Sequence, residues 1–278
     1  MAVVIRLLQS IAEYRAAEQL QRDVWGLEEV EIVPDHLMLT AQMNGGLVLG
    51  AFEAGPDRQE RLVGFACGLL GLAPEGRLKH CSDMVGVHPA YQNQGVGYRL
   101  KLAQREHVLR QGIDLITWTF DLLESRNAYL NFHKLGVTCD TYLRNLYGGM
   151  RDGLNAGLES DRFQVDWAIA SRRVFERLRG DGPGMSLSTL QAQGTPVLNN
   201  PLPGEPVHPP QAVLPIAGER FLIQIPARFQ AIKEADMGLA CAWRMHTRAL
   251  FEAAFEAGYV VVDLLHEAGE SCYLLHSS

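Results

Sequence analysis

Short apolar runs separated by polar turns fill the first part of the chain. Each run is rich in apolar or β-branched residues, which is typical of strands, and the runs cover residues 3–8, 46–53, 61–71 and 78–87. The turn-forming residues 54–57 between the second and third runs predict a β-hairpin. After the first run, Ser10 and Glu13 form a capping-box pattern and Gly26 can end a helix, so a helix is expected there.

One stretch runs as strand, glycine turn, helix and second strand. The run ending near Val87 leads into the turn, the helix is expected at residues 98–111, and the second strand at residues 113–120. Two strands joined through one helix lie parallel in the same sheet, so this stretch predicts a parallel crossover. Beyond it, a short helix that stops at Gly136 and a further strand are expected at residues 127–135 and 162–170.

The composition changes between residues 180 and 215, where Pro, Gly, Ser and Asn accumulate. Such a stretch is typical of a linker or an extended surface segment. After it, a β-α-β-β order is expected from a strand at residues 220–225, a helix at 228–257 and strands at 259–266 and 271–275. The sequence therefore predicts an α/β (α+β) fold with a domain at residues 1–178, a linker at 179–218 and a small C-terminal piece at 219–278.

Composition narrows the class of protein. The 278 residues are 47% apolar and carry a formal net charge of -7, which argues against nucleic acid as the main partner because phosphate binding needs clustered Lys and Arg. The five cysteines form no CxxC pair and are interpreted as reduced core thiols, so the cytoplasm is expected and a metal site is not. The sequence shows no signal peptide and no run near the ~20 apolar residues of a membrane span, so no membrane partner is expected.

Gln92, Gly95 and Gly97 mark the candidate binding site. They follow an apolar strand and precede an amphipathic helix. Glycines let the backbone turn tightly and approach a phosphate, while the N–H groups and the dipole of the first helical turn attract the anion. The chain has no GK[ST] of a P-loop here, and no G-x-G-x-x-G of a dinucleotide fold starts at Gly95. The pattern alone leaves two interpretations, a pyrophosphate cradle and a turn with a purely structural role.

Two stretches resemble motifs of the GNAT superfamily of N-acyltransferases. The run from Met84 to Gly97 (M-V-G-V-H-P-A-Y-Q-N-Q-G-V-G) is similar to the acyl-CoA-binding motif of the family, and Asn127 to Gly136 (N-A-Y-L-N-F-H-K-L-G) is similar to its second motif. The resemblance covers about residues 1–175 and implies a mixed, mostly antiparallel sheet, flanked by helices, that splays at the parallel crossover. It also implies that acetyl-CoA or another acyl-CoA lies in the splay, with its pantetheine amides paired to the first of the two strands.

The resemblance further implies an activity. A primary amine, on a small molecule or on a protein, would attack the thioester directly in a ternary complex, without a metal. A CoA-binding or sensor module without turnover is the alternative, and a homodimer is compatible with both. The residues that the resemblance assigns to cofactor binding are Val85, Gly86, Val87, Gln92, Asn93, Gln94, Gly95, Val96, Gly97, Tyr98, Arg99 and Asn127.

Proton-transfer residues are assigned on the resemblance as well. Asp83 lies on the strand that leads to the cofactor, where many of these enzymes have a carboxylate base, and a solvent-facing carboxylate is the alternative. Asp121 can orient the acceptor amine or cap the next element. The usual acid of the family is a Tyr, but Phe132 stands at that place in this chain. Tyr129, one helical turn earlier, and Tyr142 are the candidate substitutes.

Two further side-chain predictions concern helices. Asn127 is expected to be the N-cap of its helix. On the long C-terminal helix, Arg244 and Arg248 lie four residues apart beside Trp243. They form either an anion or acceptor site or a pair of solvated arginines beside a buried Trp, and the second interpretation is favoured.

Overall fold

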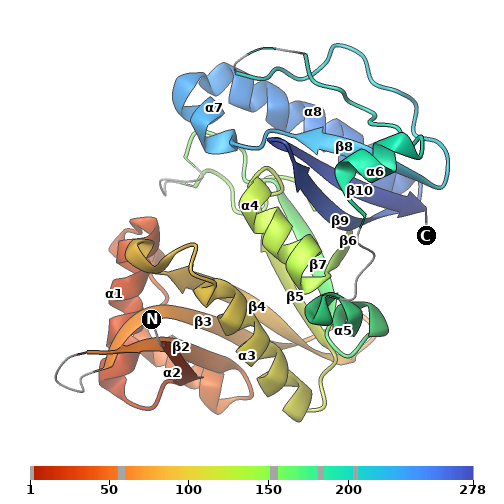
Figure 1. The fold of residues 1–278 in the computed structure, drawn as a ribbon. Coiled ribbons are helices and arrows are strands. Elements are labelled where there is room, and N and C mark those ends of the chain that lie inside the picture. Colours follow the sequence, from red (N-terminus) through yellow and green to blue (C-terminus); the bar gives the residue numbers. More distant parts are fainter. Residues whose placement is uncertain are drawn as a thin grey trace. The chain divides into compact units, whose positions relative to one another are not determined.

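The computed structural model describes residues 3–55, 60–150, 156–180, 185–202, 204 and 206–277 of the chain. The chain forms two compact units, Met1–Trp118 and Thr119–Ser278 (Figure 1). The boundary between them lies inside strand β5 (Leu115–Phe120). The sequence predicts domain boundaries at residues 178 and 218. Whether the parts so divided fold independently stays a prediction.

The sheet of the first unit has the strand order β1-β2-β3-β4-β5. Its strands are β1 (Val3–Leu7), β2 (Leu47–Ala54), β3 (Glu60–Leu72), β4 (Leu78–Val87) and the first part of β5. The pairs from β1 to β4 are antiparallel, and β4 pairs with β5 in parallel. The pairing of β2 with β3 and the parallel crossover are therefore confirmed. Pro56 and Asp57 of the expected turn lie outside the described residues.

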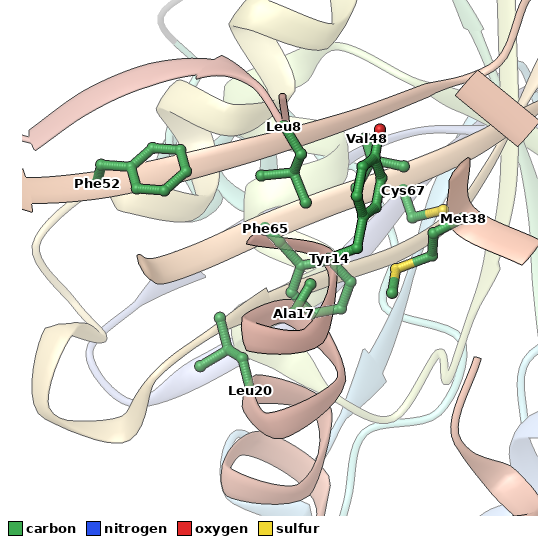
Figure 2. Close-up of a cluster of buried hydrophobic side chains, with 9 residues drawn as sticks. All are labelled: Leu8, Tyr14, Ala17, Leu20, Met38, Val48, Phe52, Phe65 and Cys67. Atoms are coloured by element: carbon green, nitrogen blue, oxygen red, sulfur yellow. The ribbon is translucent and has the colours of Figure 1, made fainter. Parts of the chain in front are cut away.

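Helices cover both faces of this sheet. They are α1 (Ile11–Trp25), α2 (Asp35–Met43) and α3 (Val96–Arg110), with short 3-10 turns at Glu29–Glu31 and Pro89–Tyr91. Neighbouring residues of a strand point to opposite faces. Phe65 of β3 packs into the apolar cluster of α1 and α2 shown in Figure 2, whereas a Cβ at the preceding Gly64 would meet side chains of α3. Helices α1 and α2 therefore lie on one face and α3 on the other.

The ends of α1 are as predicted, whereas α2 was not predicted. The Ser10 side chain accepts a hydrogen bond from the Glu13 N–H group, and Gly26 ends α1 with a left-handed φ of 65°. Helix α2 has only nine residues, of which Met38 and Ala41 are buried, and no side chain caps its N-terminus. Without a capping signal and with only nine residues, this segment carries no clear local sign of a helix.

Strand β4 contains a β-bulge at Asp83. Met84 pairs with Cys67 and Ser82 pairs with Gly68 of β3, so Asp83 is the extra residue. In a regular strand Ser82 and Met84, two positions apart, would face the same side. Here Met84 packs against the cluster of α1 and α2, whereas Ser82 contacts Lys101 of α3. The bulge therefore decides which side chains of β4 reach each helix layer.

The strands of the second unit that follow β5 are antiparallel and have the order β7-β6-β9-β10-β8. They are β6 (Thr138–Leu143), β7 (Arg162–Ala168), β8 (Arg220–Ile225), β9 (Tyr259–Glu267) and β10 (Glu270–Ser277). Cys139 of β6 pairs with Val261 of β9. The C-terminal β-α-β-β piece therefore shares one sheet with β6 and β7. Three of the six residues of β6, T-C-D-T-Y-L, are polar, so the segment shows no apolar run and no strand was predicted there.

The expected helix at residues 228–257 is wrong as a single element. The chain forms α7 (Phe229–Ala235) and α8 (Met237–Glu256) instead. Between them, Asp236 has an extended backbone, and its side chain accepts a hydrogen bond from the Leu239 N–H group at 3.0 Å. Asp236 is thus the N-cap that starts α8.

The helix near Asn127 also differs from the prediction. It begins with α4 (Ser125–Ala128), whose N-cap is Glu124, and continues as a π-helix (η3, Tyr129–Leu135) up to the left-handed Gly136. Asn127 is therefore the third helical residue and not the N-cap. The stop at Gly136 is confirmed.

The segment rich in Pro and Gly contains a helix that was not predicted, α6 (Leu187–Ala192), and α5 (Arg172–Arg179) precedes the segment. Leu187 and Leu190 belong to an apolar cluster with Leu222 of β8 and Leu265 of β9. The Leu198 N–H group donates to the carbonyl oxygen of Leu222 at 2.9 Å. Part of this segment therefore packs against the sheet of the second unit.

Gly68→Ala is expected to destabilise the protein. A Cβ at Gly68 would lie 2.2 Å from Nε2 of His80 and 2.8 Å from the carbonyl oxygen of Cys81, so the strand or the imidazole must shift. Overpacking of this kind lowers the free energy of unfolding by about 1–3 kcal/mol, which urea denaturation measures. Gly149→Ala is the matched control, because its Cβ would meet no atom within 4 Å. Equal effects of the two changes would contradict the close packing of His80 against β3.

Candidate functional site

Gly95 starts helix α3. Its φ of 77° lies in the left-handed region that favours glycine, and it is an N-cap without a side chain to bond the first turn. The N–H groups of Val96, Gly97 and Tyr98 belong to the first turn, which has no partners within the helix. The first turn contains no acidic residue. The start of α3 therefore presents N–H donors and the positive end of the helix dipole.

Side-chain amides hold the loop before α3 in place. The Gln92 Nε2 atom donates to the carbonyl oxygen of Val87 at 3.1 Å, and the Gln94 Nε2 atom donates to that of Ala90 at 3.0 Å. Asn93 between them has a left-handed φ of 62°. The glutamine that the motif assigns to the phosphate thus supports the turn in this structure.

Two further motif residues have defined surroundings. A Cβ added at Gly97 would meet only a methyl carbon of Val87, at 3.8 Å, which is ordinary contact. Gly97 is therefore not required by packing within the protein. The Arg99 Nη2 atom donates to the carbonyl oxygen of Val3 at 2.6 Å, so Arg99 ties α3 to the edge strand β1.

One edge of β4 is open next to this loop. Val85, Gly86 and Val87 pair with β3 on one side. On the other side, β4 pairs with β5. In the described strands, His80 pairs with Ile116 and Cys81 pairs with Thr117. Strand β4 continues for several residues beyond that pair. Its backbone groups from the bulge to Val87 are therefore available on this side to an extended ligand.

Asp83 lies at the bulge between the paired part and the open part of β4. Its side chain is exposed. Desolvation by the surrounding protein nevertheless raises the pKa of this carboxyl above its usual value. A carboxylate with a raised pKa is a better proton acceptor near neutral pH.

A buried polar cluster lies between β4 and α3. The Lys101 Nζ atom donates to Ser82 Oγ at 2.8 Å and to Gln104 Oε1 at 3.1 Å. The Gln104 Nε2 atom lies 3.1 Å from Nε2 of His80. Lys101 is 4% exposed and His80 is fully buried, and Nδ1 of His80 has no hydrogen-bond partner. Burial lowers the pKa of Lys101 well below its usual value.

The sequence analysis missed this cluster. The buried positions of α3 are Val96, Leu100, Lys101, Gln104 and Val108. Two polar residues therefore interrupt an apolar stripe at helical spacing, which was the available signal. His80 and Ser82 carry no such signal, because the bulge decides which face of β4 each of them occupies.

The remaining site predictions lie in the second unit, and Asp121 is held there by arginines. The Arg244 guanidinium donates to both carboxylate oxygens of Asp121, with 2.9 Å between Nη1 and Oδ1. The Arg162 Nη1 atom lies 3.7 Å from Asp121 Oδ2. Asp121 also accepts the Leu123 N–H group at 2.9 Å. This carboxylate therefore has structural partners, as the capping alternative expected.

The tyrosine candidates also have defined partners. The Tyr129 ring stacks on His133 with centroids 4.6 Å apart, and burial raises the Tyr129 pKa. Tyr142 donates to Asp161 at 2.6 Å, and burial raises its pKa further from neutrality. Phe132, at the place of the usual acid, is fully buried.

The expectation of solvated arginines on the C-terminal helix is wrong. Arg244 is 2% exposed and Arg248 is 8% exposed. Arg248 donates to Asp161 through Nε at 2.8 Å and also pairs with Glu159. Buried guanidinium groups require such partners, and these carboxylates come from segments more than 80 residues away in sequence.

Comparisons with known proteins return structural resemblances. No protein-family model matches the chain, and no curated protein matches its sequence. A chain of the NatC complex bound to Gag peptide and CoA matches with a TM-score of 0.49 and 16% identity, over 60% of this chain and 99% of that chain. The ribosomal-protein-S18-alanine N-acetyltransferase of Escherichia coli matches with 0.46 and 16%, over 61% and 96%. A GNAT-family acetyltransferase of Streptococcus pneumoniae matches with 0.46 and 16%, over 59% and 98%.

About 60% of this chain thus resembles solved acetyltransferases, and the rest extends beyond the matches. The predicted α+β fold is confirmed by the topology of the chain itself. Helices flank the sheet of the first unit, and β4 with β5 is the one parallel pair among the described strands. At these TM-scores and identities, the substrates of the matched proteins say nothing about the substrate of this chain.

Among the described residues, no helix is long and apolar enough to span a bilayer. No group of three or more His, Cys, Asp and Glu side chains in the same part of the chain could hold a metal ion.

His80 is expected to stay uncharged in the folded protein at neutral pH. Burial lowers its pKa to about 4, whereas an unfolded His titrates near ~6.5. As the pH falls below ~6.5, the unfolded state binds the proton first, so His80 reduces the free energy of unfolding progressively until the pH passes the folded pKa. Ring-nitrogen NMR of the native protein measures this titration directly. A midpoint near the unfolded value would contradict the buried position of His80.

Proposed function

We propose that this chain is a GNAT-type N-acyltransferase that binds acetyl-CoA or another acyl-CoA along β4 and at the start of α3. The observation that carries the proposal is the juxtaposition of two features. The glycine-capped N-terminus of α3 directly follows a strand whose edge beyond Cys81 is open. The acceptor is a primary amine of a small molecule or a protein.

The start of α3 would bind the pyrophosphate. The N–H groups of Val96, Gly97 and Tyr98 point along the axis at the helix N-terminus, where an anion is stabilised. The space beside Gly97 fits such a ligand, because only one methyl group of Val87 lies within 4 Å of a Cβ built there. A phosphate group could therefore approach the backbone closely.

The open edge of β4 would bind the pantetheine arm. The arm carries amide groups, and amides can pair with an unpaired strand edge as an added strand does. Four residues, from Met84 to Val87, span about 13 Å at ~3.3 Å per residue. The thioester supplied by the cofactor would then lie near the bulge at Asp83.

Asp83 would accept the proton of the acceptor amine. An ammonium has no lone pair, and a free alkylamine has a pKa near ~10.4, so a base is needed before attack. The carboxylate of Asp83 lies at the bulge and has a raised pKa. A backbone N–H group at the bulge would stabilise the developing oxyanion. Asp121, Tyr129 and Asn127 stay predictions about the second unit.

A CoA-binding module without turnover is the second candidate. It is favoured by one observation, the complete burial of Phe132 at the position of the usual acid. A phenyl ring cannot donate a proton. Thiol release measured with a panel of amines separates the two functions, because tight CoA binding without thiol release would favour the module.

Gly97→Ala is expected to weaken CoA binding at least tenfold while the unfolding midpoint changes little. The added Cβ fits the free protein but would obstruct a phosphate at the backbone. Isothermal calorimetry measures the affinity. Unchanged affinity in Gly97→Ala would place the phosphate elsewhere, and absence of CoA binding by the unmodified protein at millimolar concentration would overturn the proposed function.

Asp83→Asn is expected to reduce kcat by about 10²–10⁴, the contribution of a general base, with the CoA affinity unchanged. In the unmodified protein, kcat should rise with pH through the raised pKa of Asp83, and this rise should disappear in the variant. Asp114→Asn is the control, because Asp114 is an exposed carboxylate paired with Arg77. Undiminished turnover in Asp83→Asn would exclude Asp83 as the base.

A further inference from the structure

The amino group of Lys101 lies where β4 and β5 stop pairing. The last paired positions are Cys81 and Thr117. Ser82 and Trp118 are the next residues of the two strands. The Lys101 Nζ atom lies 2.8 Å from Ser82 Oγ and 3.5 Å from the centroid of the Trp118 ring. One side chain of α3 therefore contacts both strands directly beyond their last paired position.

Nothing else about this lysine explains its burial. It is 4% exposed, and no carboxylate among the described residues pairs with it. Burying an amine without an acidic partner is unfavourable, and an apolar side chain of similar length would pack at lower cost. The contacts that offset this cost are Ser82 Oγ, Gln104 Oε1 and the face of Trp118.

We propose that Lys101 is a positioning residue that links β4 to β5 at the end of their pairing and so fixes the opening that accepts the pantetheine arm of CoA. The proposal rests on the function proposed above. The link lies one residue beyond the last paired position of the two strands. The separation of the two strands is thereby set by a side chain of α3, the same helix that presents the phosphate-binding N–H groups.

Lys101→Met removes the amino group and keeps an unbranched side chain of similar length. The methionine fills the same space, and Ser82 Oγ still donates to Gln104 Oε1 at 3.2 Å, so these two groups keep a hydrogen-bond partner and the variant should fold. Without the link, the spacing of Ser82 and Trp118 is no longer held. The phosphate-binding turn at Gly95 does not depend on this contact.

Calorimetry with two probes tests the proposal. CoA needs both the turn at Gly95 and the opening, whereas ADP carries the diphosphate without a pantetheine arm. Lys101→Met should bind CoA about tenfold more weakly, a change of ~1.4 kcal/mol, and should bind ADP as the unmodified protein does. Lys79→Met is the matched control, because Lys79 lies on β4, the strand of Ser82, and is only partly buried. The affinities of this variant for CoA and for ADP should both be unchanged.

Two results would overturn the proposal. Equal losses for CoA and ADP would show a general structural defect, and unchanged CoA affinity would show that the amino group has no role in the opening. If the unmodified protein binds neither probe, the proposed function fails instead. Amide hydrogen exchange of the ligand-free proteins then tests directly whether Lys101 links the two strands. Lys101→Met should exchange faster at residues 80–84 and 116–118, and unchanged exchange there would exclude the link.

Discussion

The β-bulge at Asp83 is the constraint on which the rest of the first unit depends. The extra residue places Ser82 on the face of α3 and Met84 on the face of α1 and α2. The pairing of β4 with β5 ends at Cys81, two residues before the bulge. A bulge changes the facing of the side chains that follow it, so one inserted residue decides which helix layer each side chain of β4 reaches, next to the open edge.

Helix α3 connects the two halves of the candidate site. Its first turn supplies N–H groups without a capping side chain, and its second turn supplies Lys101. Because the helix is rigid, the distance between the turn at Gly95 and the end of the β4 pairing is fixed by the helical rise of ~1.5 Å per residue. In the proposed function, phosphate binding and the spacing of the strands would therefore both depend on this one helix.

Buried charge is handled differently in the two units. In the second unit, Arg244 and Arg248 are paired with Asp121 and Asp161, and these partners raise the pKa of both arginines in spite of their burial. Desolvation raises the pKa of Asp161, but hydrogen bonds from Arg248 and Tyr142 outweigh it, so this pKa is lowered overall. In the first unit, Lys101 and His80 are buried among neutral partners, and their pKa values are lowered. These two buried basic groups of the first unit therefore favour the uncharged state.

The sequence by itself determined the elements with strong local signals. The apolar strands, the glycine turn at Gly95, the parallel crossover and the helix stop at Gly136 follow from periodicity and from backbone conformations that favour glycine. The tertiary structure alone decided the bulge at Asp83, the buried cluster around Lys101 and the partners of Arg244 and Arg248. Each of these depends on pairing register or on contacts between distant segments, and a local pattern of apolar and polar residues contains no information about which distant group will satisfy a buried charge.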